Sequence, residues 1–451
     1  MAKKAQFASK IGLIAATVGS AVGLGNIWRF PAEVQSNGGA AFLIVYLVCV
    51  LILGIPVMVS EFALGRAGHS DSVGAFKNLG AAKGWWAIGG LAILASYLIL
   101  CFYMVVAGWS FEYLWQSVSG SLYESAVEGG TVNFYDKMDE YIKGPVSPLL
   151  NTYAMIFINL VVLIAGVRSG IERISNIMMP ILFGILIIFI FESLSLPKAA
   201  EGLAFFLEPD FSQITPSVFL NALGQAFFSL SLGMGILITY SSYFPSNTRL
   251  VRTAVTVASL DMIVALMMGL IIFPAVTSFG LSGEGLRGAT LVFITLPEVF
   301  SQMALTRFWS ILFFLLLTVA ALTSTISIAE VSVAFVRDRF GMARWKACLI
   351  VILPLLFFST VCSLSLGQWS EIRIAGFNIF DFLDNLATNI MLPVVSIFMC
   401  VYMGWFAPGD LLSQQLTNNG TFRTRLYKPI LFIIRFVAPV LIAIVLVSYF
   451  F

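Results

Sequence analysis

The sequence predicts an all-α polytopic membrane protein with 11 transmembrane helices. Of its 451 residues, 59% are hydrophobic and only 11% are charged, whereas about 25% of residues are charged in soluble domains. Apolar blocks of helix-spanning length recur along the whole chain, which excludes a soluble globule. The formal net charge of +2 comes without a basic block interleaved with aromatic residues, so nucleic acid is not expected as a partner.

Each predicted helix is an apolar segment of about 20 residues or more, the length that crosses the hydrocarbon core of a bilayer. We expect one transmembrane domain over residues 1–451. Its predicted helices, numbered 1 to 11 in chain order, are 11–34, 40–66, 85–117, 147–166, 175–192, 220–242, 250–277, 307–337, 346–366, 378–406 and 429–451.

The first segment is interpreted as a retained membrane helix, because the apolar stretch after Lys3, Lys4 and Lys10 lacks a small-residue cleavage pattern. Cytoplasmic loops carry an excess of Lys and Arg, and most of these residues fall on one side if the N-terminus is inside. The N-terminus is therefore expected in the cytoplasm. On the opposite side, the apolar run 291–297 is too short to span and is expected to form part of an extracellular cap.

The pattern lacks the residues that metal-centred or nucleophilic catalysis needs. The cysteines at positions 49, 101, 348, 362 and 400 lie in apolar segments without metal-site or disulfide spacing. His69 is the only histidine and stands in a polar loop, so no His pair and no Ser-His partnership is available. We expect the cysteines to pack in the interior and do not expect an enzyme.

Helices 1 and 6 carry glycine-rich interruptions at matching positions. Residues 19–26 read Gly-Ser-Ala-Val-Gly-Leu-Gly-Asn, and residues 229–235 read Ser-Leu-Ser-Leu-Gly-Met-Gly. Such interruptions at corresponding places in two halves are typical of discontinuous helices in inverted repeats. A broken helix frees carbonyls for cations and amides for anions. The alternative, close helix packing at small residues, fits the glycines equally well.

Polar residues near the interruptions favour ion binding. Asn26 follows the first interruption, Ser229 and Ser231 belong to the second, and Asp261 lies in an apolar run. A carboxylate within the bilayer costs several kcal/mol unless it is paired, so Asp261 needs a cation or a proton.

Helix 8 adds a third oxygen-rich site. Its residues Ala320, Thr323 and Ser324 are spaced to place two hydroxyls and one carbonyl on a single face. Oxygen ligands without sulfur or imidazole suit hard cations such as sodium. The alternative is that each hydroxyl bonds back to its own helix, the commoner arrangement for a lone hydroxyl in a membrane helix.

Several motifs resemble the neurotransmitter:sodium symporter family, in its bacterial amino-acid transporter branch. The segments that carry the resemblance are 19–31 (GSAVGLGNIWRFP), 37–39 (NGG), 55–66 (IPVMVSEFALGR), 229–235 (SLSLGMG) and 322–324 (LTS). The resemblance extends to helix 11 and so covers essentially the whole chain. It implies the leucine-transporter fold, a five-plus-five inverted repeat over about residues 11–192 and 220–406 followed by an additional helix at 429–451. A twelfth helix, usual in animal members, is absent from this pattern, which bears on oligomer contacts more than on transport.

The resemblance implies two co-transported sodium ions. The first would be held by the carbonyl of Ala21, by the side chains of Asn26, Ser229 and Asp261, and by the substrate carboxylate. The second would be held by the carbonyls of Gly19, Val22 and Ala320 and by the hydroxyls of Thr323 and Ser324.

The resemblance also implies a site for an L-amino acid. Its carboxylate would meet the amides of Leu24 and Gly25 and the hydroxyl of Tyr103, and its ammonium would meet carbonyls near Phe228 and Ser229, with Ser231 and Ala21 close by. The substrate side chain would face Ile99, Tyr103, Phe228, Met234, Ser324 and Ile328. Taken singly, each of these apolar residues is more simply explained as helix packing.

Two gates are implied in the same way. Arg29 and Asp381 would form the outer charged gate above a lid of Tyr103 and Phe228. Lys4, Phe7, Tyr243 and Asp338 would close the inner route, although arginine and tryptophan are commoner in the family at the positions of Lys4 and Phe7.

The sequence therefore predicts a sodium-coupled symporter that imports hydrophobic and aromatic L-amino acids by alternating access across a bacterial inner membrane. Chloride is not expected as a cofactor, because Asp261 supplies a fixed negative charge even though Ala265 stands where bacterial members often have glutamate. A transporter-like amino-acid sensor is the alternative, and a membrane-embedded enzyme is a weaker one.

Overall fold

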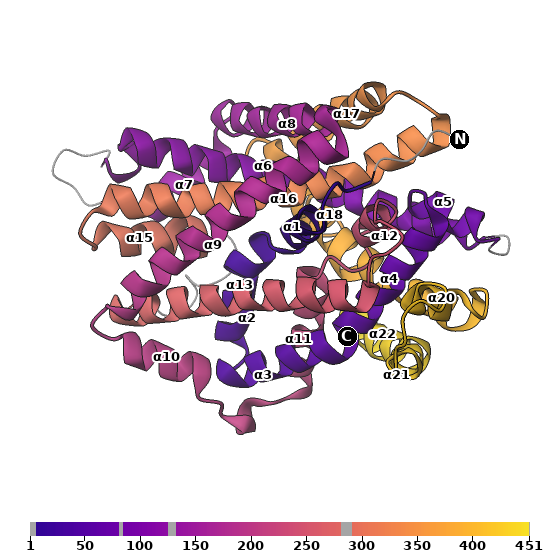
Figure 1. The fold of residues 1–451 in the computed structure, drawn as a ribbon. Coiled ribbons are helices and arrows are strands. Elements are labelled where there is room, and N and C mark those ends of the chain that lie inside the picture. The colour runs from indigo at the N-terminus through magenta and orange to yellow at the C-terminus, as the bar shows by residue number, and fades with distance from the viewer. Residues whose placement is uncertain (1–5, 81–83, 125–131, 281–290, 451) are drawn as a thin grey trace.

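The computed structural model describes residues 6–80, 84–124, 132–280 and 291–450, which form the helical bundle in Figure 1. The predicted gate residue Lys4 lies outside these ranges. The longer helices are α1 Lys10–Ala21, α3 Ala40–Cys49, α4 Ile55–Gly68, α6 Trp86–Ser119, α7 Phe134–Lys143, α8 Ser147–Gly166, α9 Arg173–Leu194, α11 Pro216–Ser229, α13 Leu250–Ser278, α16 Thr306–Phe340, α17 Arg344–Leu364, α19 Leu392–Val401 and α22 Ala438–Ser448.

Shorter elements complete the bundle. The short α-helices are α2 Phe30–Ser36, α5 Ser72–Asn78, α10 Ala199–Leu207, α12 Ile236–Ser241, α15 Leu296–Ser301, α18 Ile379–Asp384, α20 Leu411–Thr417 and α21 Tyr427–Phe432. The π-helical and 3-10 segments are η1 Gly25–Arg29, η2 Val50–Gly54, η3 Ser121–Tyr123, η4 Val167–Glu172, η5 Phe211–Gln213, η7 Leu291–Thr295, η8 Asn385–Met391, η9 Tyr402–Phe406 and η10 Ile433–Val437. One antiparallel hairpin joins β1 Arg373–Ile374 to β2 Phe377–Asn378, with Arg373 opposite Asn378.

The all-α membrane fold predicted from the sequence is confirmed. Among the described residues, eight helices are long and apolar enough to span a bilayer, and the bent pair Lys10–Ala21 and Gly25–Ser36 makes a ninth span. One of the eight, Ser147–Leu194, has 48 residues, more than twice the length that crosses a bilayer, and it turns between α8 and α9 at Gly166, whose φ is +95°. Counting this turn and the separate halves α11 and α12 makes the structure compatible with the predicted 11 helices.

Helix 1 breaks where the glycines predict it. Ser9 begins α1 by accepting a hydrogen bond from the amide of Gly12, and Val22 ends it with extended backbone. The chain then turns by 53° before the second half, which continues through Pro31 at the start of α2. Proline fits this position because the first turn of a helix needs no intrahelical amide donor.

Helix 6 is interrupted between α11 and α12. The backbone has positive φ at Ser231 (55°), Gly233 (77°) and Gly235 (73°). Glycine reaches this region without steric cost, so the Gly-Met-Gly sequence suits two of the three positions. Ser231 is stabilised there by a hydrogen bond that its hydroxyl donates to the carbonyl of Ser20, at 2.9 Å.

The long helices α6 and α16 pack side by side through the middle of the bundle (Figure 1). The run beginning at Leu291 forms η7 and α15 and is largely buried. Its Phe293 ring lies 6.2 Å from the ring of Trp28 and 5.9 Å from that of Trp109. The run therefore folds back over aromatic residues of helices 1 and 3, as expected for a cap.

Candidate functional site

The two helix interruptions lie against each other in the interior. The hydroxyl of Ser231 bonds to the carbonyl of Ser20, and the side-chain amide of Gln225 donates to the carbonyl of Gly25 at 3.2 Å. Backbone groups released from helix 1 are thus partly satisfied by helix 6. Residues of both interruptions line a common space.

That space is a small cavity of about 20 Å³, room for about one water molecule. The predicted substrate residues all line it except Leu24; its lining comprises Ser20, Ala21, Gly23, Gly25, Ile99, Tyr103, Phe228, Ser229, Ser231, Met234, Ser324 and Ile328. The structure therefore brings together residues of helices 1, 3, 6 and 8 that are up to about 300 positions apart in the sequence.

Leu24 was expected to offer its backbone amide to the substrate, and it is not among the residues that line the cavity. Leu24 lines a larger neighbouring space, the vestibule, while its amide donates to the hydroxyl oxygen of Tyr103 at 3.1 Å. The amide and the hydroxyl that were expected to receive a carboxylate are therefore adjacent to each other. Gly25 and Tyr103 line both the cavity and the vestibule.

The side chains predicted for the first sodium ion form one buried cluster. The amide nitrogen of Asn26 donates to Asp261 Oδ1 at 2.8 Å and to Ser229 Oγ at 3.2 Å, and Ser229 donates to Asp261 Oδ2 at 2.6 Å. Tyr46, which sequence reasoning missed, places its hydroxyl 3.4 Å from both Ser229 and Asp261. Ala21 contributes to the adjacent cavity wall.

The residues predicted for the second sodium ion meet where α1 packs on α16. Ser324 Oγ lies 3.5 Å from the carbonyl of Val22, to which it donates. A Cβ atom on Gly19 would lie in ordinary van der Waals contact with the Cβ of Thr323, at 3.4 Å, so the two helices are close here. Thr323 donates back to the carbonyl of Ala320 at 3.1 Å, which matches the back-bonding alternative for this hydroxyl.

The vestibule has a volume of about 630 Å³ and adjoins the cavity. Tyr103 and Phe228 line both the cavity and the vestibule. These two side chains therefore lie between the two spaces, at the position expected for the predicted lid. The other lining residues of the vestibule are Leu24, Gly25, Trp28, Arg29, Ala32, Glu33, Ser36, Phe102, Val106, Trp109, Leu366, Phe380, Asp381, Asp384, Thr388 and Asn389.

The predicted outer gate residues, both in the described part of the chain, are present at the vestibule without contacting each other as an ion pair. Arg29 and Asp381 both line the vestibule, but no ion pair joins them among the residues that the structure describes. The Arg29 guanidinium lies 4.5 Å from the centre of the Phe228 ring and 3.8 Å from Glu33, while Asp381 accepts a hydrogen bond from Asn378 at 2.8 Å. Arg29 therefore contacts Phe228 and Glu33, and Asp381 contacts Asn378, in place of the predicted pair.

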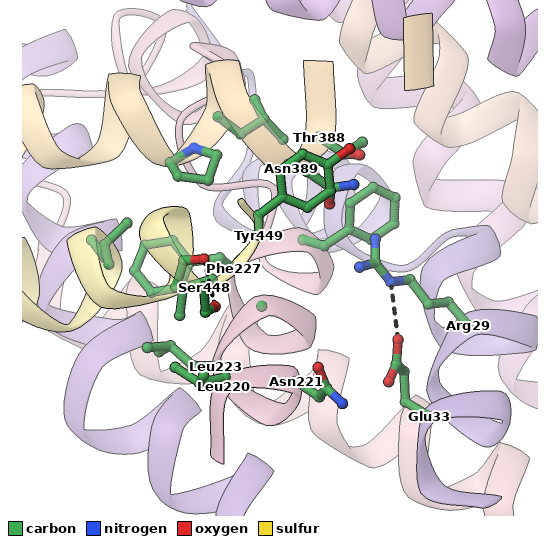
Figure 2. A pocket seen from close by; sticks show the side chains of 16 residues that line it. Arg29, Glu33, Leu220, Asn221, Leu223, Phe227, Thr388, Asn389, Ser448 and Tyr449 are labelled. Atoms are coloured by element: carbon green, nitrogen blue, oxygen red, sulfur yellow. Dashed lines mark hydrogen bonds and ion pairs between the residues drawn. The ribbon is translucent and has the colours of Figure 1, made fainter. Parts of the chain in front are cut away.

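A side chamber of about 330 Å³ adjoins the vestibule (Figure 2). Figure 2 shows the Arg29–Glu33 pair at one end of the chamber, with α11, the η8–α19 helix and α22 around it. The polar residues of its lining are Arg29, Glu33, Asn221, Thr388, Asn389, Ser448 and Tyr449. The other lining residues are Leu220, Leu223, Gly224, Phe227, Phe228, Leu392, Pro393, Ile442 and Val445.

The end of the bundle at Phe7 is closed by aromatic packing. Phe7, only 2% exposed, lies edge-on to Tyr240 and Tyr243 at centroid distances of 5.9 and 6.2 Å, and its amide donates to the Tyr243 carbonyl at 3.2 Å. Asp338 forms an ion pair with Arg337 at 2.8 Å. Phe7 and Tyr243 are thus brought together as predicted.

Two carboxylates at this end were missed by sequence reasoning. Glu330 accepts a hydrogen bond from the Tyr243 hydroxyl at 2.8 Å and forms a bidentate pair with Arg344 at 2.9 and 2.6 Å. Glu172 accepts from the amides of Ala8 and Ser9 at 2.7 and 3.0 Å and from the Ser9 hydroxyl at 2.9 Å. Glu172 thereby attaches the start of helix 1 to η4.

Glu61 is a third missed carboxylate. It is fully buried in α4 and accepts a hydrogen bond from the amide of Gly233, at 2.8 Å, inside the helix 6 interruption. The signal that identified Asp261, a carboxylate within an apolar run, also marks Glu61 and Glu330.

Comparison with known proteins agrees with this arrangement. The sequence matches the Sodium:neurotransmitter symporter family over residues 4–128 and 133–451. It is 35% identical over 447 residues to a sodium-dependent transporter of Bacillus subtilis, YhdH, covering 99% of this chain and 98% of that protein. A sodium-dependent transporter of Haemophilus influenzae is 34% identical, with 98% and 97% covered. The crystal structure of MhsT in complex with L-phenylalanine superposes with a TM-score of 0.89 at 40% identity, covering 99% of this chain and all of that one.

The family match spans nearly the whole chain, and the similarity to MhsT extends the agreement to the fold. The homologues are sodium-dependent transporters and not enzymes. This chain belongs to the sodium:neurotransmitter symporter family and is a multi-pass, sodium-dependent membrane transporter.

Proposed function

We propose that this protein uses the sodium gradient to import hydrophobic and aromatic L-amino acids into a bacterial cell by alternating access. The observation that carries the proposal is the meeting of two broken helices around a small cavity, whose lining includes Ser229 of one oxygen-rich cluster and Ser324 of the other. Two sodium ions would occupy these clusters, with Asn26, Ser229 and Asp261 holding one and Thr323 and Ser324 helping to hold the other.

The close packing around Gly23 supports an amino acid with a free carboxylate as the substrate. A Cβ atom on Gly23 would lie 2.4 Å from Ser324 Oγ and 3.0 Å from the Tyr103 hydroxyl oxygen, so a side chain does not fit here in this conformation. The protein therefore supplies no carboxylate of its own at this point. The substrate would bring one, beside the positive end of the second half of helix 1.

The walls of the cavity support an apolar side chain. Ile99, Phe228, Met234 and Ile328 line it without a charged partner, and burying an unpaired charge would be costly. A cavity of about 20 Å³ is too small for leucine or phenylalanine, so binding requires the site to expand. Met234 is a flexible residue between two glycines with positive φ, which allows its wall to adjust. The similarity to MhsT, whose structure contains L-phenylalanine, supports the same substrate class.

The open vestibule and the packed inner end support a transport cycle. The vestibule reaches the Tyr103 and Phe228 lid from one side, while Phe7 and its aromatic neighbours fill the other. We assign the vestibule to the outer face and the N-terminus to the cytoplasm, because most Lys and Arg residues then lie inside. Helix 5, with Pro180 inside α9 and η4 before it, would open the inner route to water.

Asp261 supports transport without chloride. Its carboxylate lies within the cluster of Asn26, Ser229 and Tyr46, where it would neutralise part of the sodium charge. No separate anion is then needed for charge balance.

Uptake by purified protein in proteoliposomes tests the proposal. With an inward sodium gradient, leucine, phenylalanine, tyrosine and tryptophan should accumulate against their own gradients, and gluconate should replace chloride without loss. Decarboxylated analogues should compete poorly. A protein that binds these amino acids but accumulates none would be a sensor, and the symport proposal would be rejected.

A further inference from the structure

Five cations gather at one end of the bundle, where two membrane spans begin. Arg249 precedes α13, Arg252 lies in its first turn, and three more cations precede or begin α21. We call this set the basic rim; all five side chains are exposed, and it consists of Arg249, Arg252, Arg423, Arg425 and Lys428. It lies on the side assigned to the cytoplasm.

The two halves of the basic rim are held together by the fold. The guanidinium of Arg249 lies 4.4 Å from the centre of the Phe422 ring, so the loop before α21 covers the start of α13. Arg66, only 4% exposed, donates to the carbonyl of Thr248 and to the side-chain oxygen of Gln415, each at 2.6 Å, and also to the Gln415 carbonyl. Arg66 thereby ties the chain before Arg249 to α20, which lies beside α4 (Figure 1).

The basic rim is left without compensating charge. Over residues 243–256 and 403–428 the sequence contains a single carboxylate, Asp410. Among the described residues, no carboxylate forms an ion pair with any of the five cations. Other cations on this side are engaged, as Arg337 is by Asp338 and Arg344 by Glu330.

Neighbouring aromatic residues place the basic rim at the level of the lipid headgroups. Trp405 and Phe406 lie at the end of the membrane span Ile379–Phe406 and are 55% and 59% exposed. Tyr427 begins α21. Tryptophan and tyrosine gather where the hydrocarbon core meets the headgroups. The cations therefore lie where the phosphates of a cytoplasmic leaflet would be.

We propose that the basic rim is a binding site for the headgroup phosphates of anionic phospholipids in the inner leaflet. The site is bipartite, with Arg249 and Arg252 on one side and Arg423, Arg425 and Lys428 on the other. It does not depend on which solute the protein carries. A phosphate bound here would receive charge-assisted hydrogen bonds from arginine.

Native mass spectrometry of the full-length, detergent-solubilised protein tests this site. Titration with phosphatidylglycerol should give a saturable complex that phosphatidylcholine of the same chain length does not. Replacing Arg423, Arg425 and Lys428 together by glutamine should raise the Kd by at least about five-fold, since each cation near an anionic headgroup contributes about this factor. The pair Arg249→Gln and Arg252→Gln should weaken binding in the same direction.

A matched control removes three exposed cations elsewhere on the same side. The variant Lys77→Gln, Arg339→Gln and Lys346→Gln loses the same total charge and should keep the Kd within about two-fold of the parent. Equal losses in both triple variants would show a general charge effect and overturn the proposal. So would equal affinity for phosphatidylcholine, and competition by soluble glycerol phosphate would instead indicate a small-anion site.

Discussion

Replacing Glu172 with glutamine should loosen the start of helix 1 at the inner end. The Glu172 carboxylate accepts three hydrogen bonds, from the amides of Ala8 and Ser9 and from the Ser9 hydroxyl. Glutamine retains one acceptor oxygen, but its amide nitrogen would face another donor. A hydrogen bond to a charged acceptor contributes about 1.5–3 kcal/mol. We therefore expect the free energy that holds this segment closed to fall by about 2 kcal/mol. This corresponds to a roughly 30-fold increase in the population of its open state.

Amide hydrogen exchange measures this opening directly. The amides of Phe7, Ala8 and Ser9 all have acceptors in the closed structure, so a peptide covering residues 6–12 should exchange roughly 30-fold faster in the variant. Glu298→Gln, an exposed carboxylate of α15, is the control and should leave exchange unchanged.

The reasoning would be refuted if Glu172→Gln kept the protection of residues 6–12 at the level of the parent. It would also fail if the whole protein exchanged faster to the same extent, because that result would report general destabilisation. Faster exchange confined to this segment, with slower exchange preserved in α6 and α16, is the expected pattern.

Three further variants test the sodium, substrate and release steps. Asp261→Asn should abolish uptake or make it depend on chloride, because the buried cluster loses its only fixed negative charge; uptake equal to the parent in chloride and in gluconate would contradict this role. Gly23→Ala should weaken amino-acid binding by about 5- to 150-fold, since its Cβ would lie 2.4 Å from Ser324 Oγ and relief of such overpacking costs about 1–3 kcal/mol; unchanged affinity by scintillation proximity would show that the helix 1 break moves freely. Pro180→Ala should slow sodium release and uptake while leaving outward-facing substrate binding intact, and normal uptake rates in proteoliposomes would exclude a hinge at this position.

The membrane spans could be predicted closely because their signal is local. Helix 7 was expected at 250–277 and is Leu250–Ser278, and helix 10 was expected at 378–406 and runs from Ile379 to Phe406. The bilayer sets the length of each apolar block. The breaks in helices 1 and 6 were equally visible, because glycines in a membrane helix and nearby oxygen-bearing side chains are sequence-local features.

The partners of charged side chains could not be predicted in this way. Arg29 was expected to pair with Asp381, but in the structure it lies on Phe228 beside Glu33. Glu172 attaches to residues more than 160 positions away, and Arg66 joins α4 to a segment near the C-terminal end. The resemblance to a family predicted substrate residues on four helices that the structure brings to one cavity, yet it did not indicate the small volume of that cavity in this conformation.

The sequence by itself determined which segments enter the membrane, where two of them break, and that oxygen atoms near the breaks suit a hard cation. Only the tertiary structure decided which carboxylate meets which donor, that the vestibule is open while the inner end is packed, and that the cations of the basic rim lie together. The physical reason is that helix formation and membrane insertion depend on contiguous residues. Ion pairs and cavities depend on how distant helices pack, which no local pattern specifies.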